Sequence, residues 1–134
     1  LRTINVKSTK SIEMIDITRE VRRFMVDERV KFGVMVIYTP HTTAGITINE
    51  NADPAVRSDI EAFLEKTIPH ESYFRHGEGN TPGHIMSSFV GASETIIIDN
   101  GELLLGTWQG IYFCDFDGPR TRKVHIKIVP DHDY

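Results

Sequence analysis

The chain has 134 residues, 40% hydrophobic and 25% charged, which are ordinary values for a single globular domain covering residues 1–134. The formal net charge of −4 and the dispersed Lys and Arg residues argue against nucleic-acid partners, which need clustered cations. No apolar run approaches the roughly 18 residues of a membrane-spanning helix, and the single cysteine fits a reducing compartment, so we expect a cytoplasmic protein without membrane partners.

The chain begins with a predicted strand followed by a predicted helix. Residues 2–8 alternate between polar and apolar side chains, as a half-buried strand does. Residues 16–28 place apolar side chains at helical spacing, with Asp16 as the candidate N-cap. The predicted buried stripe of this helix consists of Ile17, Val21, Phe24 and Met25.

Two further strands are predicted on either side of a polar turn. Residues 32–40 are rich in β-branched side chains and end at a proline, which is typical of a largely buried strand. Residues 44–50 alternate and are expected to pair with this strand as a hairpin.

Two helices are predicted in the middle of the chain. Residues 53–69 begin with Asp53 as N-cap and Pro54 at the first helical position. A second, short helix is expected from about 82 to 90, where Gly91 ends it. The apolar stripe of the first helix consists of Val56, Ile60, Phe63 and Leu64.

The last third of the chain is predicted to be mainly strands. These cover residues 94–99, residues 102–116 with a break near Gly106, and residues 122–130. Asn100-Gly101 is a favoured dipeptide for a tight hairpin turn. The whole pattern predicts an α+β fold with mostly antiparallel sheets, in two layers or a sandwich, and two to three helices.

Polar residues at the expected strand ends are candidates for function. His41, Thr42 and Thr43 follow a buried strand, where functional side chains are often displayed. Threonine hydroxyls donate to phosphate oxygens, but they equally satisfy backbone groups in turns. Arg120 and Arg122 are two residues apart, and two guanidinium groups on one strand face suit phosphate binding or pairing with surface carboxylates.

Three histidines and one tryptophan add further candidates. His70, His76 and His84 lie within fifteen residues, and imidazole binds divalent metals, although their spacing matches no established zinc motif. Loop histidines that bond to the backbone are the alternative interpretation. Trp108 lies between two glycines, where it either stacks on a planar ligand ring or packs in the core or a subunit interface.

Three segments together resemble the YjbQ-like family of small conserved proteins. They are HTTAGITINENADP at 41–54, HGEGNTPGH at 76–84 and GELLLGTWQGIYFCDFDGPRTRKVHI at 101–126, and the resemblance covers essentially the whole chain. One departure is Thr81-Pro82-Gly83 before His84, where the family commonly has Ala-x-Ala, so the start of this helix is expected to differ locally.

The resemblance implies a homotrimer with polar clefts near subunit contacts and a secondary thiamine-phosphate synthase activity. In that reaction, a pyrimidinylmethyl pyrophosphate and a thiazole phosphate join with loss of pyrophosphate. The candidate catalytic residues are His41, His84 and Asp53. The candidate substrate-binding residues are Thr42, Thr43, Asn80, Trp108, Asp117, Arg120 and Arg122. The candidate ligands for a divalent Mg or Zn-like ion are His41, His76 and His84, with Glu50 as the alternative.

Two other function classes stay open beside the transferase. The histidine set also suits a hydrolase that uses metal-bound water. A trimer that binds a small phosphorylated molecule or a metal without catalysis is the third class. The chain has no dense cluster of aspartates for magnesium, which weakens the case for pyrophosphate departure as the main reaction.

Overall fold

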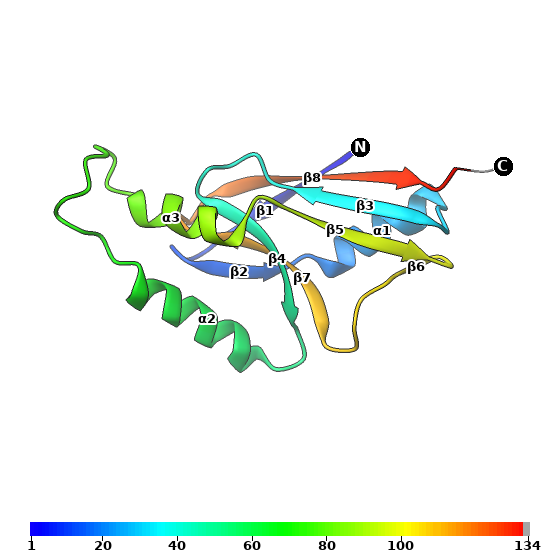
Figure 1. Ribbon diagram of the computed structural model, residues 1–134, viewed down its shortest axis with the longest axis horizontal. Coiled ribbons are helices and arrows are strands. Elements are labelled where there is room, and N and C mark those ends of the chain that lie inside the picture. Colours follow the sequence, from blue (N-terminus) through cyan, green and yellow to red (C-terminus); the bar gives the residue numbers. More distant parts are fainter. Residues whose placement is uncertain (133–134) are drawn as a thin grey trace.

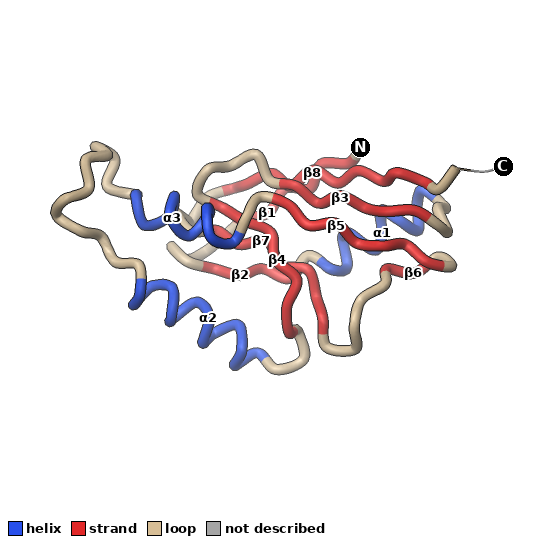
Figure 2. Tube along the Cα trace, viewed as in Figure 1, coloured by secondary structure: helices blue, strands red, loops and turns tan. Residues whose placement is uncertain are grey.

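A computed structural model describes residues 1–132 and shows an α+β fold built from antiparallel strands and three helices (Figures 1 and 2). A five-stranded sheet has the order β1-β8-β3-β5-β6, and a three-stranded sheet has the order β2-β7-β4. In chain order, the elements are β1 (Arg2–Lys7), β2 (Glu13–Asp16), α1 (Thr18–Glu28), β3 (Gly33–Tyr38), β4 (Ala44–Glu50), α2 (Pro54–Thr67), α3 (Thr81–Val90), β5 (Ser93–Asp99), β6 (Glu102–Leu103), β7 (Gln109–Asp115) and β8 (Thr121–Pro130).

Two apolar clusters hold these layers together. The larger cluster joins the inner face of the five-stranded sheet to α1 and to one face of the three-stranded sheet. The smaller cluster lies on the other face of the three-stranded sheet and includes side chains of α2 and α3. Strand β7 contributes to both, because Ile111 and Phe113 face the first cluster while Tyr112 and Cys114 face the second. Its alternating side chains are therefore buried on both faces.

Several local predictions are confirmed. The predicted stripe of α1 is buried. The predicted N-cap is wrong by one residue, because Ile17 takes the N-cap position, although Asp16 before it accepts a hydrogen bond from the backbone N–H of Thr18 at 2.9 Å. Asp53 caps α2 by accepting from the N–H of Ala55, also at 2.9 Å. Asn100 and Gly101 both have positive φ and join β5 to β6 in a two-residue hairpin.

The predicted hairpin of residues 32–40 and 44–50 is wrong. Strand β3 pairs with β5 and β8, whereas β4 pairs with β7 in the other sheet. The turn between β3 and β4 therefore carries the chain from one layer to the other. Residues 102–116 are likewise divided between the sheets, because β6 pairs with β5 and β7 with β4.

Two other expectations also need correction. The short strand β2 lies in a segment for which no strand was predicted, and it pairs with β7. Phe63 of α2 is 66% exposed, although Val56, Ile60 and Leu64 are partly buried, because α2 covers only the edge of the smaller cluster.

No helix within residues 1–132 is long and apolar enough to cross a membrane.

The arrangement of strands brings two turns that are distant in sequence to one end of the molecule. Ala44 at the start of β4 pairs with Asp115 at the end of β7, and Thr121 at the start of β8 pairs with Lys7 of β1. The turns at 40–43 and 116–120 therefore meet, and α3 packs along β4 beside them (Figure 1). Figure 2 shows the long loop of residues 68–80 that leads into α3.

Candidate functional site

A polar pocket of about 350 Å³ lies where these turns meet. It collects side chains from the β3–β4 turn, the loop before α3, the first turns of α3 and the β7–β8 turn. We call it the His41–Arg122 pocket. Its lining residues are Pro40, His41, Thr42, Thr43, His76, Glu78, Asn80, His84, Asp117, Arg120 and Arg122. Most of the sequence-predicted site residues are therefore brought together within one chain.

The most buried polar feature of the pocket is the ion pair of Arg122 and Asp115. Arg122 is 5% exposed and Asp115 is fully buried, and both belong to the inward-facing rows of their strands. The Arg122 Nε and Nη2 atoms donate to the two carboxylate oxygens of Asp115 at 3.1 and 2.9 Å. Nη2 also donates to Thr43 Oγ1 at 2.8 Å. This bidentate pair fixes the guanidinium group between the two sheets.

The environment of Asp115 keeps its carboxyl group ionised. Burial alone raises the pKa of Asp115, but hydrogen bonds from Arg122, from Ser8 Oγ and from the backbone N–H of Asp117 outweigh it and lower the pKa overall. Arg122 therefore has a permanent counter-charge. Its remaining terminal nitrogen, Nη1, takes part in none of the hydrogen bonds among residues 1–132.

Arg120 and Asp117 form a second, more exposed pair at the pocket. Arg120 Nε donates to the Asp117 carbonyl oxygen, and Nη2 donates to Asp117 Oδ2, both at 2.8 Å. Asn80 Nδ2 donates to the same carboxylate oxygen at 2.9 Å. Both arginines line the pocket, but the expectation that they share a strand face is wrong, because Arg120 precedes β8. The alternative of pairing with a surface carboxylate applies to Arg120 alone, since the partner of Arg122 is buried. The two arginines differ sharply in exposure, because Arg122 faces the core and Arg120 precedes β8.

His41 is held by the backbone of the neighbouring strand. Its Nε2 atom accepts a hydrogen bond from the N–H of Lys123 at 2.9 Å, which leaves the proton of the neutral ring on Nδ1. Burial and the nearby charge of Arg122 lower the pKa of His41, so the ring is neutral near pH 7. A neutral ring in this state donates one hydrogen bond and is a weak proton acceptor.

His76 and His84 also line the pocket, and their rings contact each other. Their rings are 5.3 Å apart between centroids and nearly perpendicular, and His76 Nε2 lies 4.0 Å from a Glu78 carboxylate oxygen. Together with His41 they line the same cavity. No three histidine, cysteine or carboxylate side chains in the described range 1–132 are placed to hold one metal ion. The predicted ligand set does not form a metal centre in this conformation.

Three predicted site residues lie elsewhere. Glu50 is at the far end of β4 from Ala44, six residues away, which is roughly 20 Å along a strand. Its carboxylate accepts from the backbone N–H groups of Ala52 and Asp53, while the Asp53 carboxylate caps α2. Trp108 lies beside them and is 63% exposed, so it is not a core residue. Within one chain, none of the three reaches the His41–Arg122 pocket.

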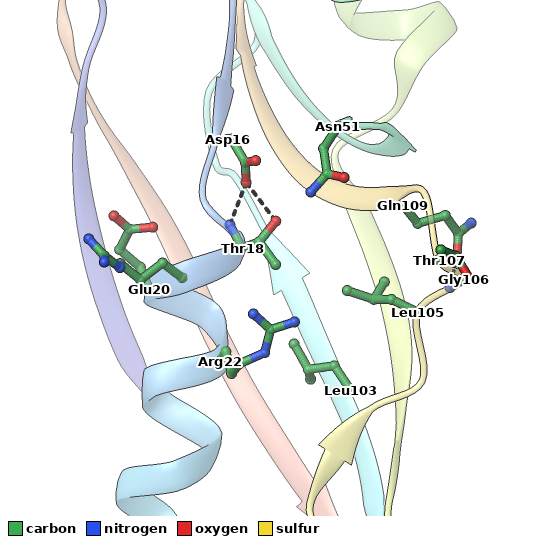
Figure 3. Close-up of a pocket in the computed structure, with 11 residues that line it drawn as sticks. Asp16, Thr18, Glu20, Arg22, Asn51, Leu103, Leu105, Gly106, Thr107 and Gln109 are labelled. Carbon is green, nitrogen blue, oxygen red and sulfur yellow. Dashed lines mark hydrogen bonds between the residues drawn. The ribbon is translucent and has the colours of Figure 1, made fainter. Parts of the chain in front are cut away.

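A larger cavity of about 600 Å³ lies near Trp108, between α1 and residues 103–109 (Figure 3). Leu103 and Leu105 form its apolar wall, and Asp16 is occupied by hydrogen bonds from Thr18. The positive charges of Arg19 and Arg22 in its lining are offset by the negative charges of Asp16 and Glu20. It contains no histidine and no fixed ion pair, so its chemistry is less specific than that of the His41–Arg122 pocket.

Sequence reasoning missed four residues of the site. Pro40 and Glu78 line the pocket. Asp115 binds Arg122, and Ser8 donates a hydrogen bond to Asp115. Asp115 has a recognisable signal, because a carboxylate inside the apolar run of residues 111–116 must find a buried partner. Ser8 follows β1 and carries no comparable signal.

Comparisons with known proteins show the family of the chain. The model of the UPF0047 protein YjbQ-like family matches residues 2–131. The UPF0047 protein YugU of Bacillus subtilis is 56% identical over 130 residues, which cover 96% of this chain and 98% of that protein. A UPF0047 protein of Methanocaldococcus jannaschii is 55% identical over 126 residues, which cover 94% and 91% of the two chains.

Solved structures show the same fold. A crystal structure of an uncharacterised conserved YjbQ/UPF0047 protein from Clostridium acetobutylicum superposes with a TM-score of 0.93 at 50% identity, covering 96% of this chain and all of that one. A YbjQ-like protein of unknown function from Sulfolobus solfataricus gives a TM-score of 0.92 at 28% identity, with coverage of 97% and 96%. The chain belongs to the UPF0047, or YjbQ-like, protein family.

Proposed function

We propose that the His41–Arg122 pocket binds the phosphate of a small phosphorylated substrate and that the chain acts as a thiamine-phosphate synthase-like transferase. The observation that carries the phosphate site is the fixed guanidinium group of Arg122, whose Nη1 atom has no partner among residues 1–132. Arg120 likewise uses only Nε and Nη2 for Asp117. Two guanidinium nitrogens therefore remain to donate to an anion at the same pocket.

The remaining lining residues complement a phosphate group. The hydroxyl of exposed Thr42 is used by none of the hydrogen bonds within the described chain, and the neutral His41 ring can donate from Nδ1. Arg122 needs no reorganisation to bind, because Asp115 already holds it in place. Prearranged donors of this kind stabilise developing charge better than mobile ones.

In the proposed reaction, the thiazole nitrogen attacks the methylene carbon of the pyrimidinylmethyl pyrophosphate. A C–N bond forms, the C–O bond to pyrophosphate breaks, and pyrophosphate leaves with the bonding electron pair. Arg120 and Arg122 would stabilise the charge that develops on the leaving group. His84 is the candidate acid, because its ring lines the pocket and takes part in no hydrogen bond within residues 1–132.

The divalent ion expected from the histidines and carboxylates of the sequence stays a prediction. The residues of the pocket do not form a three-ligand metal set in this conformation. Elemental analysis of protein prepared with zinc, iron, nickel and magnesium tests the ion directly. A stoichiometric metal that disappears in the double variant His76→Ala/His84→Ala would revive the metal-dependent hydrolase as the better proposal.

The decisive experiment is synthesis of thiamine phosphate from the two purified precursors with added magnesium. We expect wild-type protein to form product and the Arg120→Ala variant to lose most of this activity. Arg120 is the suitable position, because it is exposed and its removal leaves the buried pair of Arg122 intact. Arg23→Ala is the matched control, since Arg23 lies on the exposed face of α1.

The outcomes separate the function classes. Product formation that is lost in Arg120→Ala but kept in Arg23→Ala supports the transferase. Full activity in Arg120→Ala would refute the role of Arg120 at the phosphate. Binding of phosphate compounds without turnover, measured as thermal stabilisation, would leave the non-catalytic binding protein as the better account.

We also expect a homotrimer, as the resemblance implies. The outer face of the five-stranded sheet supports an assembly of copies, because Tyr38, Ile97 and Val129 on it are each roughly half exposed. Sedimentation analysis at several concentrations measures the mass directly. A monomer across the whole range would contradict this expectation.

A further inference from the structure

We infer that Ser8 is a positioning residue of the phosphate site, because its hydroxyl group holds Arg120 and Arg122 in a fixed position relative to each other. The inference rests on the phosphate site proposed above and adds a residue that lies outside the lining of the pocket. Ser8 directly follows β1 and is 1% exposed, so a ligand in the pocket does not touch it. Any effect of Ser8 on such a ligand therefore passes through the two arginines.

The hydroxyl group of Ser8 joins the counter-ion of one arginine to the backbone of the other. Ser8 Oγ donates to Asp115 Oδ2 at 2.7 Å, and the same carboxylate binds the guanidinium group of Arg122. Ser8 Oγ also accepts from the backbone N–H of Arg120 at 2.9 Å. The backbone N–H of Ser8 donates in turn to the Arg120 carbonyl oxygen, again at 2.9 Å. One buried side chain thus fixes where the backbone of Arg120 lies relative to Asp115.

Asp117 closes these contacts into a ring of hydrogen bonds. Its backbone N–H donates to Asp115 Oδ1 at 3.0 Å, and its carbonyl and carboxylate oxygens each accept from the Arg120 side chain at 2.8 Å. Arg120 is therefore tied to Asp115 by two routes, one through Ser8 and one through Asp117. Loss of the Ser8 hydroxyl group would open the ring and leave only the route through Asp117.

The β7–β8 turn that leads into Arg120 packs directly on Ser8. A Cβ atom at Gly118 would lie 2.6 Å from Ser8 Oγ, which shows how closely the turn backbone approaches the serine side chain. The backbone N–H of Gly118 also donates to the Ser11 carbonyl oxygen at 3.1 Å. Because close-packed groups transmit small displacements, a change at Ser8 is expected to shift the turn and Arg120 with it.

A fixed spacing of the two arginines favours an anion that contacts both. Each arginine has an Nη1 atom that takes part in none of the hydrogen bonds among residues 1–132. An anion that binds both groups gains most when they are already in place, since ordering them on binding lowers the affinity. We therefore expect removal of the Ser8 hydroxyl group to weaken the binding of pyrophosphate.

The test compares Ser8→Ala with a control that removes an equivalent hydroxyl group elsewhere. Thr18 Oγ1 likewise donates to a carboxylate, that of Asp16 at 2.6 Å, and accepts from a backbone N–H, that of Ile111 at 2.9 Å. Thr18 is 7% exposed and does not line the His41–Arg122 pocket. Thr18→Val therefore loses the same kinds of hydrogen bond away from the phosphate site, and both variants should have a lower Tm.

Calorimetric titration with pyrophosphate gives the first readout. We expect Ser8→Ala to bind pyrophosphate at least about tenfold more weakly than wild-type protein, and Thr18→Val to keep the wild-type Kd within about twofold. If Ser8→Ala does not fold, Ser8→Cys takes its place in the same comparison, because a thiol of similar size is only a weak donor and acceptor.

The nuclear magnetic resonance signals of the arginine Nε–H groups, recorded without ligand and well below either Tm, give the second readout. The Arg120 signal is assigned by its absence from Arg120→Ala. In Ser8→Ala we expect this signal to shift and its proton to exchange faster with solvent, because the ring is open. In Thr18→Val it should stay in place, since a general loss of stability leaves the folded state unchanged.

The possible results distinguish this inference from the phosphate site on which it rests. A wild-type Kd or an unchanged Arg120 signal in Ser8→Ala would overturn the positioning role and leave the phosphate site standing. Equal losses of affinity in Ser8→Ala and Thr18→Val would overturn it as well, because a general loss of stability would then account for both. Failure of wild-type protein to bind pyrophosphate would refute the phosphate site itself.

Discussion

Replacing Arg122 with methionine removes one partner of the buried ion pair and leaves the Asp115 carboxylate without its counter-charge. Asp115 is fully buried and keeps only the hydrogen bonds from Ser8 Oγ and the Asp117 N–H. Removing one partner of a buried pair costs about 3–5 kcal/mol of the free energy of unfolding. At about 2.1 cal/mol/K of unfolding entropy per residue, this loss lowers the Tm of a 134-residue chain by about 11–18 °C.

The loss in Arg122→Met is also expected to depend on pH. In the wild type the pKa of Asp115 is below its ordinary value of 3.8, so its stabilisation is complete above that value and is lost as pH falls through the folded-state pKa. In the variant, only the hydrogen bonds from Ser8 and Asp117 still oppose the effect of burial, so we expect the pKa of Asp115 to lie above its wild-type value and the cost of the unpaired charge to fall as pH is lowered from 7. The difference between the two proteins therefore shrinks on acidification.

Denaturant unfolding of both proteins between pH 4 and pH 7, followed by circular dichroism, measures this difference. Asp115→Asn/Arg122→Met is the informative companion, because it removes the uncompensated charge and should be more stable than Arg122→Met at pH 7. A loss below about 1 kcal/mol at pH 7, the value of a surface pair, would refute the reasoning. A loss that stays constant from pH 7 to pH 4 would refute it as well.

Gly83→Ala should destabilise the protein by about 1–3 kcal/mol in thermal unfolding, because its Cβ would lie 2.8 Å from the Phe116 carbonyl oxygen, whereas Gly77→Ala, which meets nothing within 4 Å, should be neutral. Asp53→Ala should cost about 1 kcal/mol through loss of the α2 cap, and a result equal to that of exposed Asp59→Ala would contradict the capping role. Cys114 should react with a thiol reagent only after unfolding, since burial raises its pKa to about 12, and rapid reaction of the native protein would contradict this.

The parts of the fold that the sequence predicts well are those decided by neighbouring residues. The stripe of α1, the Asp53 cap and the Asn100-Gly101 hairpin each depend on a few consecutive positions. Strand partners depend on the whole chain instead. Residues 44–50 have the same alternation whether they pair with residues 32–40 or with β7, so nothing local indicates that the chain crosses between layers there.

In the candidate site, too, residue types could be predicted from short segments, whereas their positions in space could not. The polar turns containing His41, Asn80 and Arg120 were recognisable from residue type, and the structure brings them to one pocket. The distance of Trp108 and Asp53 from that pocket could not be predicted, because they are close to site residues in sequence but lie at the opposite end of β4 and β7. Two residues at opposite ends of one strand are close in sequence and still lie a full strand length apart.

Co-crystallisation of the protein with pyrophosphate would test most directly the claim that the His41–Arg122 pocket binds a phosphate group. Our account places the anion in the His41–Arg122 pocket, within hydrogen-bond distance of Arg122 Nη1 and Arg120. Pyrophosphate bound only in the cavity between α1 and residues 103–109, or a His41–Arg122 pocket that stays empty at saturating ligand, would contradict it.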